Sequence, residues 1–412
     1  MSKLTDEVER QMTAIRRGAA DIVPEEELEE KIARSLKEGE PLRVKLGLDP
    51  TAPDIHVGNA VPLHKLRTFQ DLGHTAVLIV GDYTATVGDP SGQNAARPQL
   101  SHDEVMANAQ TYLDQVGKIV DVETAEVRYN GDWFGKMSFG EVIELAAKLT
   151  LARCIERDDF AQRMEANLPI GLHELLYPLM QAYDSVMIHS DVELGGTDQI
   201  FNILLGRDLQ REVGQEPQAA VTNPLLEGLD GSAKMSKSKG NYIGISEPPE
   251  QIFGKAMSIP DELMQKYFIL TTDLPLPRIE ELMSSDVHPR DAKAALAESI
   301  VSRYYDEEAA EEAHAGFNRV FRRHKLPEEM PELALPASDL EDGCIWIVNL
   351  LRAAECAESN SQARRLVKQG GVRLGHPDGL EEVTDPTADV RVEDGMVLNV
   401  GKRRFHRIAV ES

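Results

Sequence analysis

The sequence predicts an α/β protein. Its first large domain is expected to be a doubly wound parallel sheet, followed by a helical domain and a small α+β domain. Short apolar runs at 42–48 and 76–80 have the length of strands, and each leads directly into a loop rich in glycine, proline or aspartate. Unbroken apolar runs are typical of strands buried on both faces of a parallel sheet. Segments with helical spacing separate these runs, as expected for a doubly wound fold.

The first forty residues predict two helices divided near Gly18. Pro24 suits the first turn of the second helix, and Glu25, Glu26 and Glu27 favour the positive end of its dipole. We expect residues 1–40 to form a solvated helical lead-in to the first domain.

The domain predicted for 41–230 is organised around the strand at 42–48 and the loop that follows it. Two prolines in the loop fix φ and remove backbone donors, and a helix begins near Ile55. A strand, a tight loop and a helix N-terminus together present free N–H groups to an anion. His56 could donate to a phosphate, and Gly58 would let a base or ribose approach the backbone. By itself, so short a pattern favours an ordinary solvated histidine.

The rest of this domain repeats the alternation of strands and helices. Strands are predicted at 127–130 and 191–194, and helices at 102–118, 139–164 and 197–212. The glycine-rich loops 88–92 and 195–196 follow strands, at the edge where open α/β sheets bind ligands.

The second half of the chain is predicted to be mainly helical and then α+β. Residues 231–325 carry a cationic loop, Lys234–Ser238, and helices that begin at prolines or show helical spacing. Three prolines mark a linker at 326–338. In the last domain, 339–412, the stretch 359–375 predicts a capped helix, a glycine stop and a strand.

The cationic loop is out of character with the rest of the chain, which has 70 Asp and Glu against 44 Lys and Arg and a net charge of −26. Alone, the loop could be an exposed basic segment. Read with Pro50–Asn59, and in that order, it resembles the signature pair of class I aminoacyl-tRNA synthetases. Three further stretches are similar to the tyrosine enzymes of that class: Gly88–Gly92, Tyr177–Asp184 and Gly195–Gln199.

The similarity runs almost from end to end, and the chain is identified as a member of the bacterial tyrosyl-tRNA synthetases, in their longer subtype. This resemblance implies a Rossmann-like catalytic domain and a C-terminal S4-like RNA-binding domain. It also implies a reaction in which L-tyrosine and ATP give tyrosyl-adenylate and pyrophosphate. The tyrosyl group is then transferred to the 3′-terminal adenosine of tRNA(Tyr), and AMP is released.

The resemblance also assigns roles at the first step, in which a carboxylate attacks the α-phosphate. That step needs alignment and charge stabilisation rather than an activated nucleophile. Mg²⁺ would accompany ATP, and no protein-bound metal is expected. The implied catalytic residues are Thr51, His56, Lys234 and Lys237. The implied ATP-binding residues are Gly47, Gly58, Asn59, Gly196, Asp198 and Lys237.

Tyrosine recognition is assigned in the same way. Tyr177, Gln181 and Asp184 fall at i, i+4 and i+7, so one helix face presents all three. Asp184 would accept the phenol hydroxyl. Lys45 stands where the shorter subtype has a second phenol-contacting tyrosine, so that contact is unassigned. The implied tyrosine-binding residues are Asp49, Asp89, Tyr177, Gln181, Asp184 and Gln199. Asn59 and Gln93 also depart from the family pattern.

The tRNA-binding residues are expected in the last domain. Residues 359–376 contain four cations and no acid, and residues 342–412 carry a net charge of only −1. A basic surface helix alone is usually just a solvated face, but a synthetase upstream favours RNA binding. The expected residues are Arg364, Arg365, Lys368, Arg373, Lys402, Arg403 and Arg404.

Composition sets the remaining limits. No apolar run of 18 residues and no signal peptide occurs, so no membrane association is expected. The cysteines Cys154, Cys344 and Cys356 are scattered, which indicates neither a zinc site nor disulfides and favours a reducing cytoplasm. The family implies a homodimer.

Two alternatives stay open from the sequence. The sister tryptophan enzyme would share the fold and chemistry, although Asp184 suits a phenol better than an indole. A non-synthetase RNA-binding protein could keep an inactive nucleotide fold, although the intact lysines and His56 argue against it. The abundance of acids and scarcity of lysine, 17 in all, further suggest a salt-adapted organism, or simply an acidic protein.

Overall fold

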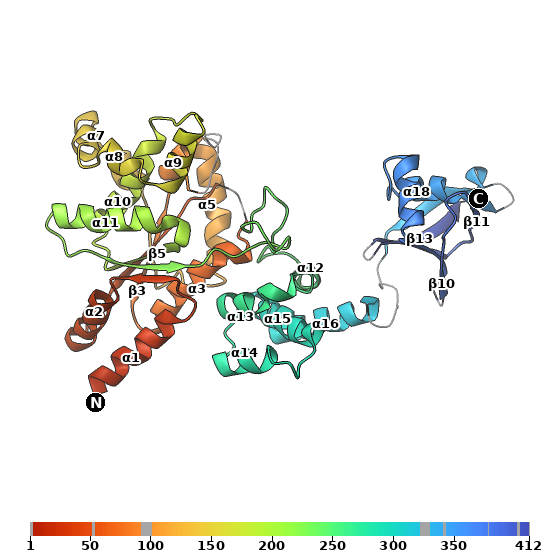
Figure 1. Ribbon diagram of the computed structural model, residues 1–412, viewed down its shortest axis with the longest axis horizontal. Coiled ribbons are helices and arrows are strands. Elements are labelled where there is room, and N and C mark those ends of the chain that lie inside the picture. Colours follow the sequence, from red (N-terminus) through yellow and green to blue (C-terminus); the bar gives the residue numbers. More distant parts are fainter. Residues whose placement is uncertain are drawn as a thin grey trace. The chain divides into compact units, whose positions relative to one another are not determined.

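The computed structural model describes residues 3–51, 54–91, 101–321, 330–340, 343–377, 379–401 and 404–411 (Figure 1). The chain divides into two compact units, Met1–Glu311 and Glu312–Ser412. Within the described ranges, no helix is both long and apolar enough to span a membrane.

The first unit is built on a six-stranded sheet that confirms the predicted doubly wound core. All neighbouring pairs are parallel except the edge strand β1, which pairs antiparallel with β6. In the sheet the strands follow the order β1 (Asp21–Val23), β6 (Ala219–Asn223), β5 (Val192–Gly196), β2 (Arg43–Leu48), β3 (Thr75–Val80) and β4 (Glu126–Tyr129). The sequence predicted β2, β3, β4 and β5 but neither β1 nor β6.

Helices cover both faces of this sheet. In Figure 1, α10 (Tyr177–Met187) and α11 (Ile200–Glu212) lie on one side, and α1 (Lys3–Arg16) and α2 (Glu25–Glu38) lie on the other. The remaining helices of the α/β part are α3 (Val57–Asp71), α4 (Thr84–Val87), α5 (His102–Val116), α6 (Gly131–Phe134), η1 (Glu174–Leu176) and η2 (Thr197–Gln199).

The single helix predicted for 139–164 is wrong. The structure has three short helices instead: α7 (Phe139–Ala146), α8 (Leu151–Cys154) and α9 (Asp158–Glu165). Ser138 and Thr150 each accept a hydrogen bond from a backbone N–H three residues ahead, so each begins a new helix. Capping chemistry therefore outweighs the helical composition of the stretch.

The prediction of a solvated lead-in at 1–40 is also wrong. Met12, Ile15, Leu28 and Ile32 are fully buried. At the end of α1, the Lys65 ammonium donates to the carbonyl oxygens of residues 15 and 17, both at 2.6 Å. The two helices and β1 are integral parts of the first unit because they bury an apolar face and complete an edge of the sheet.

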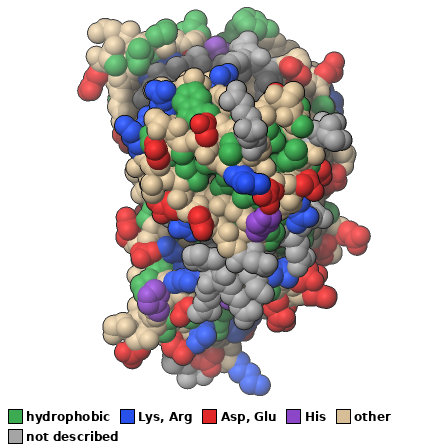
Figure 2. Space-filling model, turned by 90° about the vertical axis from the view of Figure 1, so that its right-hand side faces the viewer, with side chains coloured by type: hydrophobic (Ala, Val, Ile, Leu, Met, Phe, Trp, Pro, Cys, Tyr) green, Lys and Arg blue, Asp and Glu red, His purple; other side chains and the backbone are tan. Residues whose placement is uncertain are grey.

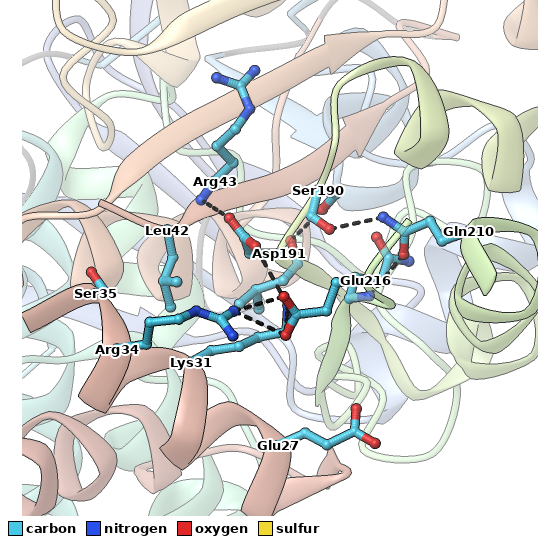
Figure 3. A network of polar contacts seen from close by, with 12 residues as sticks. Glu27, Lys31, Arg34, Ser35, Leu42, Arg43, Ser190, Asp191, Gln210 and Glu216 are labelled. Atoms are coloured by element: carbon cyan, nitrogen blue, oxygen red, sulfur yellow. Dashed lines mark hydrogen bonds and ion pairs between the residues drawn. The ribbon is translucent and has the colours of Figure 1, made fainter. Parts of the chain in front are cut away.

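A polar network fastens α2 to the amino ends of β2 and β5 (Figure 3). The buried Lys31 ammonium lies 3.4 Å from Asp191 and 3.3 Å from Glu216. Asp191 also accepts the backbone N–H of Arg43 at 2.9 Å, and Arg34 forms a forked pair with Glu216. The sheet is therefore held from its amino edge, which leaves the carboxyl edge free for the candidate site.

The first unit continues as a helical region, in agreement with the predicted fold class. Its members are α12 (Pro249–Ala256), η3 (Asp261–Leu263), α13 (Met264–Thr271), α14 (Leu276–Leu282), α15 (Pro289–Tyr304) and the start of α16 (Glu307–Phe321). His64 of α3 bonds the hydroxyl of Tyr304 at 3.0 Å, which joins this region to the sheet domain.

The second unit is a small α+β domain with its own apolar core, centred on Leu350, Val367 and Leu398. Its five-stranded sheet has the order β10 (Gly379–Glu382), β9 (Val372–His376), β12 (Val397–Val400), β13 (Arg404–Glu411) and β7 (Glu332–Pro336). The other elements are β8 (Cys344–Trp346), which pairs with β11 (Asp389–Arg391), η4 (Ala337–Asp339), α17 (Ile347–Ala353) and α18 (Asn360–Lys368).

The stretch expected to be a linker, 326–338, contains a strand. Its last part forms β7, which pairs in parallel with β13. Residues 326–329 lie outside the described part of the chain. Three prolines had suggested irregular structure, yet β7 is an edge strand, where proline is tolerated.

Candidate active site

The loop after β2 places the Asp49 carboxylate at the carboxyl edge of the sheet. One oxygen of Asp49 accepts the Tyr177 hydroxyl at 2.8 Å, and the other accepts the Thr84 hydroxyl at 2.8 Å. Gly81 makes this possible, because a Cβ there would lie 2.0 Å from an Asp49 oxygen. The predicted tyrosine-binding residues Asp49 and Tyr177 are thus in direct contact.

Asp89 and Gln199 form a second contact at the same edge. Gln199, in η2 after β5, donates to Asp89 at 2.9 Å and to the Ser91 hydroxyl at 3.1 Å. The backbone N–H of Ser91 donates to the other Asp89 oxygen at 2.9 Å. The carboxylate is therefore oriented by its own loop and by the neighbouring strand end.

The face of α10 carries the predicted recognition residues. Gln181 donates from Nε2 to Glu193 of β5 at 3.0 Å and accepts at Oε1 from Asn202 at 2.8 Å. Asn202 also donates to Gln199 at 3.1 Å. Sequence reasoning missed Glu193 and Asn202, although both belong to segments correctly predicted as strand and helix.

Asp184 is buried, and its carboxylate accepts hydrogen bonds from two side chains that the sequence did not indicate. Trp133 Nε1 donates at 2.9 Å and Asn130 Nδ2 at 3.3 Å. Burial raises the pKa of the Asp184 carboxyl to about 7, against the opposing effects of Lys45 and of these two donors. Asn130 and Trp133 follow β4 directly, so their position after a strand end was the available signal.

Lys45 forms contacts within the protein core. Its fully buried ammonium donates to the Gln181 carbonyl at 2.7 Å and the Ser185 hydroxyl at 2.8 Å, and pairs with Glu193 at 2.9 Å. An ammonium has three N–H donors. All three are engaged, so Lys45 does not supply the missing phenol contact.

His56 caps the N-terminus of α3. Its Nδ1 accepts the backbone N–H of Asn59 at 3.2 Å, so the neutral ring carries its proton on Nε2 and can donate from there. Burial, and then the charges of Lys237 and Lys234, lower the pKa of His56 to about 4. His56 is therefore a neutral hydrogen-bond donor near pH 7.

The cationic loop packs against the N-terminus of α3. Met235 is buried, and a Cβ on Gly58 would lie 3.4 Å from it and 3.1 Å from the His56 ring. A glycine at 58 thus serves loop packing as well as any ligand. Lys234 lies 2.6 Å from Asp198, and Lys237 lies 3.3 Å from Asp54.

The other predicted residues lie along the same edge. The half-buried Thr51 donates its backbone N–H to the Asp49 carbonyl at 2.8 Å. A Cβ on Gly196 would lie 2.7 Å from Asp198, whereas one on Gly47 would meet no described atom within 4 Å. In the described ranges, no group of three His, Cys, Asp or Glu residues is arranged to hold a metal ion.

The predicted tRNA-binding residues are exposed where the structure describes them. Arg364, Arg365 and Lys368 lie on α18, and the Arg364 guanidinium lies 5.3 Å from the centre of the Trp346 ring. The list is completed by Arg373 on β9 and Arg404 on β13, both exposed. Lys402 and Arg403 fall outside the described residues.

Comparison with known proteins agrees with this geometry. Residues 37–322 match the family tRNA synthetases class I (W and Y). A tyrosine–tRNA ligase of Moorella thermoacetica is 53% identical over 410 residues, which cover 98% of this chain and 97% of the relative. One of Thermotoga maritima is 50% identical over 405 residues, or 97% and 98% of the two chains.

A solved structure has the same fold. Tyrosyl-tRNA synthetase from Archaeoglobus fulgidus, complexed with L-tyrosine, aligns with a TM-score of 0.60 at 23% identity, covering 74% of this chain and 99% of that one. The chain belongs to the class I tRNA synthetases of the tryptophan and tyrosine group. Within that group it is one of the bacterial tyrosyl-tRNA synthetases, and thus an aminoacyl-tRNA ligase for tyrosine.

Proposed function

We propose that the tyrosine–tRNA ligase reaction of this chain takes place at the carboxyl edge of the six-stranded sheet, between α10 and the loop Lys234–Ser238. The observation that carries this proposal is the presence of two sets of polar contacts at the same edge of the sheet. One joins Asp49 to Tyr177, on the same helix as Asp184, and the other joins Asp89 to Gln199.

The site would bind both the ammonium group and the phenol hydroxyl of tyrosine. Its ammonium needs acceptors, which Asp89, Gln181 and the oxygen of Tyr177 can supply. Its phenol would donate to Asp184, whose two internal donors, Asn130 and Trp133, favour the ionised carboxylate. Asp49 and Gln199 would hold these groups in place.

ATP would lie beside His56 and the two loop lysines. Thr51 and the Nε2 proton of His56 would bind phosphate oxygens, and Lys234 and Lys237 would neutralise the leaving pyrophosphate. The nucleoside would lie against Gly47, Gly58 and Gly196, with Asn59 and Asp198 holding adenine and ribose. Asp198 would then exchange its ion pair with Lys234 for the ribose hydroxyls. Mg²⁺ bound with ATP would supply further charge neutralisation.

The second unit would bind tRNA(Tyr). Three exposed cations on one short helix, together with Arg373 and Arg404, offer positive charge to phosphates. We assign catalysis to 41–230 with the loop of the following helical domain, 231–325, and tRNA binding to 339–412.

A homodimer is proposed from an apolar surface in the first unit. Six of the exposed large hydrophobic side chains lie between residues 139 and 172, in or beside α7, α8 and α9: Phe139, Ile143, Leu151, Met164, Leu168 and Leu172. Apolar residues gathered in this way are typical of a protein interface. A cytoplasmic location is proposed because the reaction needs cellular ATP and tRNA, and the three cysteines are unpaired.

The test is ATP–pyrophosphate exchange measured separately with tyrosine, tryptophan and phenylalanine. We expect exchange with tyrosine alone. Exchange with tryptophan would overturn the assignment of Asp184 to a phenol, and no exchange with any amino acid would favour an inactive nucleotide fold.

A further inference from the structure

A continuous chain of hydrogen bonds crosses the proposed tyrosine site between two charged ends. Arg157, which precedes α9, donates to Asn202 Oδ1 at 2.8 Å. Asn202 Nδ2 donates to Gln181 Oε1 at 2.8 Å, and Gln181 Nε2 donates to Glu193 at 3.0 Å. Glu193 is paired with Lys45, its register partner on β2. Every link runs in the same direction, from the arginine to the carboxylate.

The two ends fix this direction. An arginine can only donate and a carboxylate can only accept. The oxygen of Asn202 must therefore face Arg157, and the oxygen of Gln181 must face Asn202. Rotating either amide by half a turn would set donor against donor or acceptor against acceptor.

A branch of this hydrogen-bond chain also fixes the orientation of the Gln199 amide, which donates to Asp89. Asn202 also donates to Gln199 Oε1, which leaves Gln199 Nε2 to donate to Asp89 and Ser91. Arg157 reaches this branch directly, because it donates to the Ser91 hydroxyl at 2.8 Å.

The chain is held away from water. Arg157 is 4% exposed, Asn202 1%, and Glu193 and Lys45 0%. Arg157 is fixed further by Asp159 at 2.9 Å and by the ring of Phe160. Buried polar atoms are costly to leave unpaired, so a reversed Asn202 amide has no water to satisfy it. Gln181 and Gln199 are half-buried, and their orientation follows from that of Asn202 and from the charged ends.

We propose that Arg157 and Glu193 are positioning residues that set the amide orientation of Gln181 and Gln199 for tyrosine binding. This inference rests on the proposed function. Gln181 can accept from the tyrosine ammonium only through Oε1, which keeps a second lone pair beside Asn202. In the reversed orientation its NH₂ group would face a ligand that is itself a donor.

The test compares three ligands that share the phenol: L-tyrosine, tyramine, which keeps the ammonium, and 3-(4-hydroxyphenyl)propionate, which lacks it. In Arg157→Gln and in the isosteric Asn202→Asp, we expect tyrosine and tyramine to bind about tenfold more weakly. The binding of the propionate and the KM for ATP should stay near the wild-type values. Arg157→Lys, which keeps the charge and one donor direction, should recover part of the loss.

Arg163 provides a matched control within α9. It is 1% exposed and ion-paired with Glu174, and in the described part of the chain its hydrogen bonds go to Glu174 and the Pro169 carbonyl rather than to the chain of amides. Arg163→Gln should lower the melting temperature as Arg157→Gln does but leave tyrosine affinity unchanged. Equal weakening of all three ligands in the Arg157 and Asn202 variants, or the same ligand profile in Arg163→Gln, would reduce Arg157 to a packing role and overturn the proposal.

A double-mutant cycle tests the coupling between the ends. Combined with Arg157→Gln, Glu193→Gln should weaken tyrosine binding by more than the product of the two single losses, because each charged end still restricts the amides when the other is replaced and only the double variant releases them. Losses that multiply to about a hundredfold would show independent effects and contradict the chain. If the wild-type enzyme bound neither tyrosine nor tyramine, the proposed function itself would fail, which is a distinct result.

Discussion

Asp184 gives the residue scale its sharpest prediction, because its pKa of about 7 lies far above the ordinary value of 3.8. A phenol donates best to the ionised carboxylate, so tyrosine binding should weaken as the pH falls below about 7, by up to about tenfold per unit. Titrating tyrosine from pH 5.5 to 8 should show this in the wild type and not in Asp184→Asn. His56, with a pKa of about 4, does not titrate in this range.

The same shift affects folding with a definite sign. The folded pKa of Asp184 is raised, so its contribution to the free energy of unfolding is fully present below pH 4 and is lost as the pH rises through 7. For binding, a pH profile of tyrosine affinity in Asp184→Asn identical to that of the wild type would assign the pH dependence of binding to a group other than Asp184.

His56 allows a role in capping to be separated from a role in catalysis. His56→Asn keeps an N-cap acceptor for α3, whereas His56→Ala removes the cap as well, at about 1 kcal/mol. Both variants should slow adenylate formation by about tenfold or more, because both lose the Nε2 donor. Only His56→Ala should also melt earlier. Single-turnover kinetics and thermal melts distinguish the two effects, and a normal rate in His56→Asn would leave His56 with a capping role alone.

At the scale of elements, the lysine loop should act late in the reaction. Lys237 faces Asp54 and His56. In the proposed mechanism, the charge that Lys237 would neutralise develops only as pyrophosphate leaves. Lys237→Ala should therefore depress the rate of adenylate formation by about a hundredfold while leaving tyrosine affinity nearly unchanged. Stopped-flow measurement of both quantities checks this, and equal losses in affinity and rate would contradict the assignment.

The elements also show how far the sequence could predict the structure. The apolar runs of β2 and β3 were sufficient to predict these strands, because local pattern alone determines them. β1 has three residues and β6 contains Thr222 and Asn223, so neither has a strand-like apolar run. Their pairing with each other and with β5 is a tertiary property.

The site divides in the same way. Tyr177, Gln181 and Asp184 could be placed by helix spacing and family resemblance. Asn130, Trp133 and Asn202 could not, since each acts through a partner that is more than 20 residues away in the chain. At Lys45, the sequence left the second phenol contact unassigned, and only the structure shows that Glu193 and α10 use all of the Lys45 donors.

At the scale of the whole molecule, the two units should be separable in function. Because β7 belongs to the second sheet, the cut should follow α16, at Phe321. The shortened chain should keep tyrosine-dependent pyrophosphate exchange and lose aminoacylation of tRNA. In the full chain, replacing Arg364, Arg365 and Lys368 by glutamine should weaken tRNA binding and flatten its salt dependence. Normal charging of tRNA by the shortened protein would refute the role of α18.

The net charge of −26 leads to a prediction about salt. Acidic side chains are spread over the face of the molecule in Figure 2 and are interspersed with fewer basic ones. Screening shortens from about 8 Å at ordinary ionic strength to about 3 Å in molar salt, which relieves this self-repulsion. For a salt-adapted enzyme, the melting temperature should rise strongly from millimolar to molar KCl, with tyrosine activation retained. A flat melting temperature would leave only an acidic surface.

The fastening of α2 has a consequence for the order of events during synthesis. Lys31 is synthesised before its carboxylate partners, Asp191 and Glu216. In the same way, β1 is synthesised before β6, the strand with which it pairs. The first helices therefore leave the ribosome long before the surfaces that bury them exist. The sheet can close at this edge only after Asn223 has been made, so until then the apolar face of the first two helices is uncovered on the nascent chain.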